Sequence, residues 1–361
     1  MTGVIAVLGW ELFSTYAEKL PNVSSDHTAW SSFGSLLSGF FTLTGTVATI
    51  ATLLFLARQN REMQKVTKAQ METQTFERYI NHRKLFADHL QELVALHKNT
   101  FTFRDPSSLY SEIFPDNSPH HCSFSIAPIY DENMDGENLI GEILSKLKRL
   151  KSHLNQSHFD EVEDEPQKLI LLLMSLTDHI FKIEPTKPVQ EGDITFLTNV
   201  YGINVHSLKI VVDPCLSIAN MIMRLTNNPM VDVREFNAES RFVREALVKR
   251  YYLQKVRSSV TIHKEIKGIA ILAFTYFEAQ RLRTGDAFLF PQTVKLLNAK
   301  FQSVETVKTL ADDSVFNDML NVLLGEVMYT VSLMDENHRE YERAGKVRDE
   351  LLRLLTRADN L

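Results

Sequence analysis

The segment FGSLLSGFFTLTGTVATIATLLFLA, Phe33 to Ala57, predicts a membrane-spanning helix. It belongs to a run of thirty residues, between His27 and Arg58, without an ionisable side chain. A helix of this length extends roughly 37 Å, against about 30 Å of bilayer hydrocarbon, so it can cross with some tilt. The alternative is a buried core helix, although core helices of this length usually carry a charge. We therefore expect Phe33–Ala57 to contact lipid.

The charges on either side of this segment indicate its orientation. Glu18, Lys19 and Asp26 precede it, and one acid, Glu62, lies among the basic residues that follow it. This basic flank comprises Arg58, Arg61, Lys65 and Lys68. Because basic residues concentrate on the cytosolic side of spans, we expect the chain after Ala57 to be cytosolic.

The first residues predict a second membrane contact, so residues 1–57 form the expected membrane region. Gly3 to Ala17, GVIAVLGWELFSTYA, is apolar apart from Glu11, but it is shorter than the roughly 20 residues of a full crossing. Either residues 3–17 form a short first span, which gives a helical hairpin with residues 33–57, or they form a helix lying in the membrane interface. Both interpretations stay open.

Within the span, small and hydroxyl-bearing residues recur at steps of three and four, which places them on one helical face. This small-residue stripe comprises Ser38, Thr42, Gly45, Thr49 and Thr52. Such stripes let helices approach closely in lipid, so this one favours packing on another span or self-association. The alternative is that the hydroxyls bond only to carbonyls of their own helix.

The composition predicts a folded, all-α chain with no broad affinity for nucleic acid. Thirteen glycines and eleven prolines in 361 residues are few, which disfavours Gly-rich phosphate loops and favours long helices. Cys122 and Cys215 are the only cysteines, so they indicate neither a disulfide framework nor a zinc knuckle. The net charge of −6 predicts no general attraction to polyanions.

Proline spacing divides the rest of the chain. No proline lies between Pro21 and Pro106, so the span can continue into a connecting helix, residues 58–98, whose apolar face begins at Phe76. Four prolines among polar residues predict an irregular connection over residues 99–138. Residues 139–361 then read as a cytosolic helical domain. Its expected helices, the longer ones broken, are Leu139–Leu154, Gln167–Ile183, Ile194–Ile210, Leu216–Leu225, Phe236–Leu282, Thr293–Phe301 and Val315–Leu355.

One local pattern matches a calcium loop. The EF-hand spacing is met by Asp131, Asn133, Asp135, Gly136 and Glu142. However, Pro128 disfavours the incoming helix, and polar Asn138 occupies a loop position that is usually apolar. An Asp/Asn-rich turn that caps a helix from Leu139 explains the same residues and is the preferred interpretation.

Other chemical signals are weaker. His120, His121 and Cys122 are adjacent and have no second ligand pair at zinc spacing. The range Lys249–Lys267 combines basic and aromatic residues and could contact nucleic acid, but an amphipathic helix surface is the preferred interpretation. No nucleotide, hydrolase or metalloprotease motif is present. We therefore predict a protein that is not an enzyme and that has no cofactor and no metal.

The range Trp30–Phe86 resembles bacterial phage abortive-infection membrane proteins, above all the two-span effectors of retron anti-phage systems. The likeness comprises Trp-x-x-Phe-Gly at the entry to the span, a Gly- and Thr-containing body, a Gln/Glu/Lys-rich exit helix and the step Phe-x-x-Tyr-x-x-His-Arg. It covers about a sixth of the chain and includes no catalytic signature. The short first span with Glu11 departs from the family's pattern.

This resemblance implies a toxin-like effector in the bacterial inner membrane. Its implied partner is a retron reverse transcriptase carrying its multicopy DNA-RNA product, which holds the effector inactive until phage infection releases it. The released effector then disrupts the membrane, so that the cell dies before phage mature. The competing function is a membrane-tethered helical binding or scaffold protein, for which the span is only an anchor.

Overall fold

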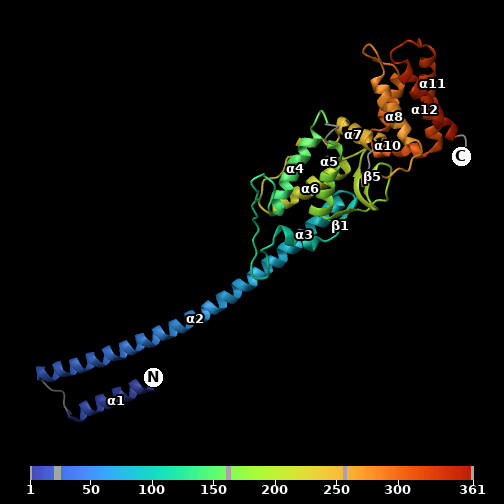
Figure 1. Ribbon diagram of the computed structural model, residues 1–361. Helices are drawn as coiled ribbons and strands as arrows, with labels where there is room; N and C mark the ends of the chain where they lie inside the picture. Colours follow the sequence, from blue (N-terminus) through green and yellow to red (C-terminus); the bar gives the residue numbers. More distant parts are fainter. Residues whose placement is uncertain (1, 20–25, 160–163, 255–257, 359–361) are drawn as a thin grey trace. The chain divides into compact units, whose positions relative to one another are not determined.

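The computed structural model describes residues 2–19, 26–159, 164–254 and 258–358. These residues are mostly helical, with a few short strands (Figure 1). The chain divides into two compact units, residues 1–77 and residues 78–361. The boundary falls inside one long helix, close to Phe76, where the predicted apolar face of the connecting helix begins.

The first unit contains α1 (Thr2–Lys19) and the first part of α2 (His27–Leu96), which lie side by side in antiparallel directions (Figure 1). Aromatic rings join them: the ring centroids of Phe13 and Phe40 are 6.0 Å apart, and those of Tyr16 and Phe33 are 5.1 Å apart. Gly9 is buried against Phe40, and a Cβ atom there would lie 3.0 Å from the Phe40 ring. A glycine at this position therefore lets the two helices approach.

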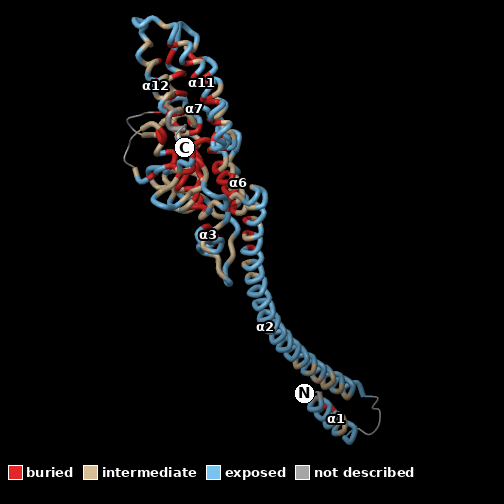
Figure 2. The backbone as a smooth tube through the Cα atoms, turned by 90° about the vertical axis from the view of Figure 1, so that its right-hand side faces the viewer, coloured by how far each residue is buried: buried red, intermediate tan, exposed pale blue. Residues whose placement is uncertain are grey.

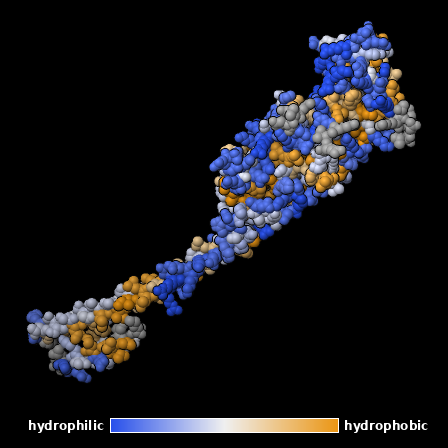
Figure 3. All heavy atoms as spheres, viewed as in Figure 1, coloured by the Kyte–Doolittle hydropathy of each residue, from blue (hydrophilic) through white to orange (hydrophobic). Residues whose placement is uncertain are grey.

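The predicted span differs from a core helix in its exposure. Among the described helices, α2 alone is long and apolar enough to cross a membrane, and none of its most apolar window is buried. Figure 2 shows this part of α2 as exposed, and Figure 3 shows hydrophobic side chains on its surface. Phe41, Leu54 and Phe55 each expose more than 60% of their surface. Soluble monomers rarely expose a contiguous apolar surface of this kind.

The second unit begins with the end of α2, where Phe86 and Leu90 are buried in its core. Its helices begin at recognisable caps: Asp105 accepts a bond from the Ser108 amide before α3, and Asp312 caps α11 in the same way. The α-helices are α3 (Pro106–Ile113), α4 (Leu139–Leu154), α5 (Glu165–Met174), α6 (Lys209–Leu225), α7 (Arg241–Val248), α8 (Ile269–Arg281), α9 (Pro291–Lys300), α10 (Val304–Lys308), α11 (Asp313–Ser332) and α12 (Tyr341–Ala358). Single helical turns follow or connect them: η1 (Ser175–Ile180), η2 (Val233–Glu235), η3 (Lys249–Leu253) and η4 (Thr309–Ala311).

Three small antiparallel sheets complete the second unit. β1 pairs with β2, β3 pairs with both β4 and β5, and β6 pairs with β7. In the central sheet Ile194 lies opposite Ile262, and a bulge interrupts the β3–β4 pairing between Asp193 and Thr195. The strands are β1 (Phe101–Phe103), β2 (Ile183–Pro185), β3 (Asp193–Phe196), β4 (Asn199–Asn204), β5 (Val260–Ile262), β6 (Arg283–Thr284) and β7 (Ala287–Phe288).

Several predicted helices are confirmed. Leu139–Leu154 has the bounds of α4, and Thr293–Phe301 corresponds to α9. The range predicted from Gln167 forms α5 and η1, with Leu173 fully buried, and the one predicted from Leu216 lies within α6. The last predicted range, from Val315 onward, is divided into α11 and α12 by residues 333–340.

The helix predicted over Ile194–Ile210 is wrong, because these residues form the β3–β4 hairpin. Leu197 has a positive φ of 56° in its loop, and β-branched and aromatic residues occupy the strands. The α-helix begins only at Lys209.

The range Phe236–Leu282 is broken, as expected for the longer helices, but the strand β5 that separates η3 from α8 was not predicted. Gly268 stands before α8 with φ 81°, and a Cβ atom there would lie 2.3 Å from Leu354 of α12. The irregular connection predicted over residues 99–138 also begins too early, because β1 and α3 lie within it. Short elements of this kind gain their stability from tertiary packing, which periodicity does not report.

Candidate functional site

The small-residue stripe predicted in the span lies on the surface of α2 that faces away from α1. All five of its residues are exposed. Phe40, which packs on α1, is two residues from Thr42, a separation of about 200° around a helix. α1 therefore leaves the stripe uncovered in the single chain, and a Cβ atom at Gly45 would meet nothing within 4 Å.

The three threonine hydroxyls of this stripe bond to their own helix. Thr42 and Thr49 each donate to the carbonyl oxygen four residues earlier at 2.8 Å, and Thr52 does so at 2.9 Å. These bonds give each threonine hydroxyl an acceptor without a partner helix. Any closer contact through the stripe would depend on packing around Gly45.

The basic flank is exposed along its whole length. Arg58, Arg61, Lys65 and Lys68 all have exposed side chains. Lys65 forms an ion pair with Glu62 at 3.4 Å, with both side chains mostly in solvent. Such pairs contribute little stability, so these positive charges remain available to an anionic surface.

The predicted calcium loop has the geometry of a turn followed by a helix cap. Asp131 accepts bonds from the backbone amides of Asn133 and Asp135, at 2.9 and 2.7 Å, and Asp135 pairs with Arg149. Asn138 caps α4 by accepting a bond from the Gly141 amide at 2.9 Å, which confirms the cap. No described helix leads into this loop.

The adjacent residues His120, His121 and Cys122 lie between α3 and α4. His120 and His121 are exposed on a tight turn closed by hydrogen bonds between Ser118 and His121. The described residues contain no group of three His, Cys, Asp or Glu side chains able to hold a metal ion.

The helix surface predicted over Lys249–Lys267 is wrong in its first part, whereas Lys264 and Lys267 are exposed. Arg250, Tyr251 and Tyr252 are buried, and Arg250 forms a two-bond ion pair with Asp164 at 2.6 and 2.7 Å. Buried side chains cannot contact nucleic acid, and β5 interrupts the helix that was expected to carry them. Lys255 and Arg257 lie outside the described residues.

A group of buried polar residues lies at the open end of the β3–β4 hairpin in the second unit. This polar cluster comprises Glu191, Asp193, Asn204, His206 and Tyr252, none of which exposes more than 6%. Asn204 donates to the Glu191 carbonyl at 2.9 Å and to the Asp193 carboxylate at 2.8 Å, and its own oxygen accepts from the His206 amide at 2.9 Å. The cluster therefore joins the two strands at their bulge.

Gly192 makes this arrangement sterically possible. Its φ is 83°, and a Cβ atom there would lie 2.6 Å from Cδ2 of His206. A side chain at this position would both strain the backbone and displace the imidazole ring. The close approach of backbone and ring therefore requires glycine.

Hydrogen bonds define the proton positions within the cluster. The Glu191 carboxylate accepts bonds from the Tyr252 hydroxyl and from the backbone amides of Glu265 and Ile266. Because the Tyr252 proton is directed to Glu191, Nε2 of His206 must donate to the Tyr252 oxygen, 3.1 Å away. Nδ1 of His206 is then a bare acceptor, and it has no hydrogen-bond partner in the described structure.

Burial and a nearby cation keep this imidazole neutral. Desolvation, and then the charge of Arg244, lower the pKa of His206 to about 3. The pKa of Asp193 is shifted in the other direction, because burial raises it more than its hydrogen bonds lower it.

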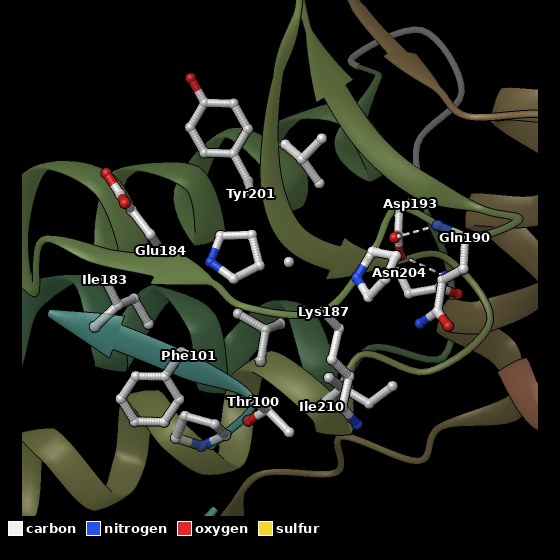
Figure 4. Close-up of a pocket in the computed structure, with 16 residues that line it drawn as sticks. Thr100, Phe101, Ile183, Glu184, Lys187, Gln190, Asp193, Tyr201, Asn204 and Ile210 are labelled. Atoms are coloured by element: carbon white, nitrogen blue, oxygen red, sulfur yellow. Dashed lines mark hydrogen bonds between the residues drawn. The ribbon is translucent and has the colours of Figure 1, made fainter. Parts of the chain in front are cut away.

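A pocket adjoins the other side of the cluster, between β1, β2, β4 and α6 (Figure 4). Figure 4 shows Asp193, Gln190 and Asn204 at one end and Tyr201 and Glu184 toward the other. Both oxygens of Asp193 are already engaged, since they accept from Asn204 and from the Gln190 amide at 2.9 Å. The pocket is therefore largely apolar, and the carboxylate of Asp193 at its polar end already has hydrogen-bond partners within the chain.

Sequence reasoning missed the polar cluster because it assigned Asn204, His206 and Tyr252 to helices. The available signal was Gly192 and Gly202 around a segment rich in Thr, Val and Tyr, which is typical of a hairpin. Comparison of the chain with protein-family models, curated proteins and solved structures gives no match. A function for this chain must therefore be inferred from its sequence and from the geometry of each unit.

Proposed function

We propose that this chain is a membrane-disrupting, non-enzymatic effector of an anti-phage defence system in the bacterial inner membrane. The observation that carries the proposal is the first part of α2: over Phe33–Ala57 most of its apolar surface stays uncovered outside the face that α1 contacts, and the exposed basic flank follows directly. Lipid is the environment that this combination of residues fits best. The wider role, in a retron system, rests on the resemblance of Trp30–Phe86 to two-span effectors.

The first unit supplies a physical route to membrane damage. α1 packs on the Phe33 and Phe40 side of α2, while the small-residue stripe on the other side stays uncovered. Copies of the helical hairpin can therefore associate through Ser38, Thr42 and Gly45 without displacing α1. Close packing of several hairpins would disturb the bilayer around them.

The second unit is the proposed binding region for the partner. A retron reverse transcriptase with its DNA-RNA product would hold the effector inactive through this cytosolic unit. α2 belongs to both units, so a partner on the second unit can influence how α2 packs in the membrane.

Gly45→Leu tests the proposal, since nothing inside the chain lies within 4 Å of the new side chain. We expect the native chain to depolarise cells that express it and to admit a membrane-impermeant dye, whereas Gly45→Leu does neither. Gly39→Leu is the matched control, because Gly39 is equally open but lies about 100° from the stripe. All three proteins should fractionate with the membrane.

Two outcomes would contradict the proposal. If the native chain and Gly45→Leu depolarise cells equally, the stripe has no part in the damage. If membrane-bound native chain leaves the potential intact, the membrane-tethered binding or scaffold function becomes the better explanation.

A further inference from the structure

His206 borders a second hollow, distinct from the pocket of Figure 4. It has a volume of about 460 Å³ and opens to the surface between the starts of α6 and α7. Its lining includes His206, Ser207, Leu208, Ser240 and Arg244. Leu208 and Ser240 are the N-cap residues of α6 and α7, so two helices of 17 and 8 residues begin at this hollow. The amides of Val211 and Val243 already donate to Leu208 and Ser240, which leaves the two amides before each of them to carry the partial positive charge of a helix start.

Arg244 adds a full positive charge to the hollow. Its side chain is half-buried, and it has no ion pair with any described carboxylate. Within the described residues its guanidinium donates from Nη1 to the Gln302 carbonyl at 3.2 Å. Burial lowers the pKa of Arg244, but a guanidinium stays charged at neutral pH. The acid on the rim, Glu239, is already paired with Lys209 at 2.8 Å. The charge of Glu245 also acts on Arg244, but its carboxylate is bound to Arg241. An anion would therefore meet a cation without a direct ion-pair partner here.

His206 supplies the observation that points to a particular anion. The Nε2 and Cδ2 edge of its ring faces Tyr252 and Gly192, so Nδ1, on the other edge, faces away from them. Nδ1 is buried and unpartnered within the described chain, and its ring borders the hollow. Because Nε2 carries the ring proton, Nδ1 can only accept a hydrogen bond. A ligand that satisfies it must offer a proton.

We propose that this hollow binds a phosphate that brings a hydrogen-bond donor with it, either inorganic phosphate, which keeps one proton near neutral pH, or a phosphate monoester with a neighbouring hydroxyl. The phosphate oxygens accept bonds from Arg244 and from the first amides of α6 and α7. A P–OH or neighbouring hydroxyl donates to Nδ1 of His206. The site is independent of whether the first unit enters a membrane.

Sulfate provides the decisive comparison, because it matches phosphate in size and shape but has no proton to donate at neutral pH. The full chain in detergent micelles is titrated at pH 7.5 and constant ionic strength with sodium phosphate, sodium sulfate and adenosine 5′-monophosphate. The shift of the unfolding temperature gives the dissociation constants. We expect phosphate to bind at least about tenfold more tightly than sulfate, because one hydrogen bond in a buried site discriminates by this much.

Arg244→Gln tests the cation, and Arg234→Gln is its control, because Arg234 is an exposed arginine outside the hollow. Arg244→Gln should weaken phosphate binding by about tenfold or more, whereas Arg234→Gln should leave it unchanged. Tighter binding of the nucleotide than of phosphate assigns the site to a monoester, and the reverse order assigns it to free phosphate. Equal affinity of the native chain for phosphate and sulfate would overturn the proposal, even if Arg244→Gln fails to fold.

Discussion

Phe41 and Leu54 in the first unit expose 63% and 68% of their surface, whereas Phe86 and Leu90, later in the same helix, expose 1% each. The residue types are alike, but their distribution around the helix differs. Around Leu54 the helix is apolar on every side, so one neighbouring helix can cover only part of it. Around Phe86 the apolar residues occupy one face, which the second unit covers with Tyr110 and its neighbours. A helix that is apolar all round needs an apolar solvent, whereas an amphipathic one needs a protein core.

Arginine substitutions should have their largest effect in the span, where they should change the membrane association of the chain. Replacing both Leu43 and Ile50 by arginine should move the chain out of the membrane fraction, because each arginine costs about 2.5–3.5 kcal/mol at the centre of a span. Val322→Arg is the control, since Val322 exposes 45% of its surface in the second unit, close to the 50% of Ile50. Ultracentrifugation after carbonate washing measures the distribution. An unchanged membrane fraction for the double variant would refute the span.

Shortening one leucine in each region should show which leucine contributes to the stability of the second unit. Leu173→Ala removes a fully buried side chain of α5 and should reduce the free energy of unfolding of the second unit by about 2–5 kcal/mol. Leu54→Ala removes the exposed leucine of α2 and should leave that free energy unchanged. Urea unfolding of the detergent-solubilised chain, followed by circular dichroism, distinguishes them. Equal losses from both variants would mean that the two regions share one core.

Acid should reduce the stability of the second unit, with the largest contribution from His206. Its pKa is about 3 in the folded chain and about 6.5 when unfolded, so the unfolded state binds a proton first as the pH falls. Stability is therefore lost between pH 6.5 and 3, by about 2 kcal/mol at pH 5. Burial lowers the pKa of His82 and His97 too and adds to this loss, whereas the raised pKa of Asp193 opposes it.

Unfolding free energies at pH 7 and pH 5 test this prediction without regard to the initial stability of a variant. The native chain should lose about 2 kcal/mol more over this interval than His206→Gln, which has no titrating ring. Equal losses in the two proteins would show that His206 is not held neutral by its surroundings.

Local signals predicted the regular helices well because their causes are local. The bounds of α4 follow from the Asn138 cap and an apolar period that ends at Leu154. The β3–β4 hairpin was missed because the same apolar residues can satisfy a helical or a strand period over a short range. The misreading of Arg250 had another cause, since basic residues usually lie on the surface, and its carboxylate partner, Asp164, is 86 positions away.

The candidate sites divide in the same way. The apolar span and its basic flank are properties of neighbouring residues, so the sequence alone determined them, together with the helical class and the cap at Asn138. Whether the span crosses a membrane stays a prediction. Only the tertiary structure decided that α1 leaves the small-residue stripe uncovered and that Glu191, His206 and Tyr252 meet. The physical reason is that these contacts join residues from different elements, and their geometry depends on packing and on Gly192 rather than on any local pattern.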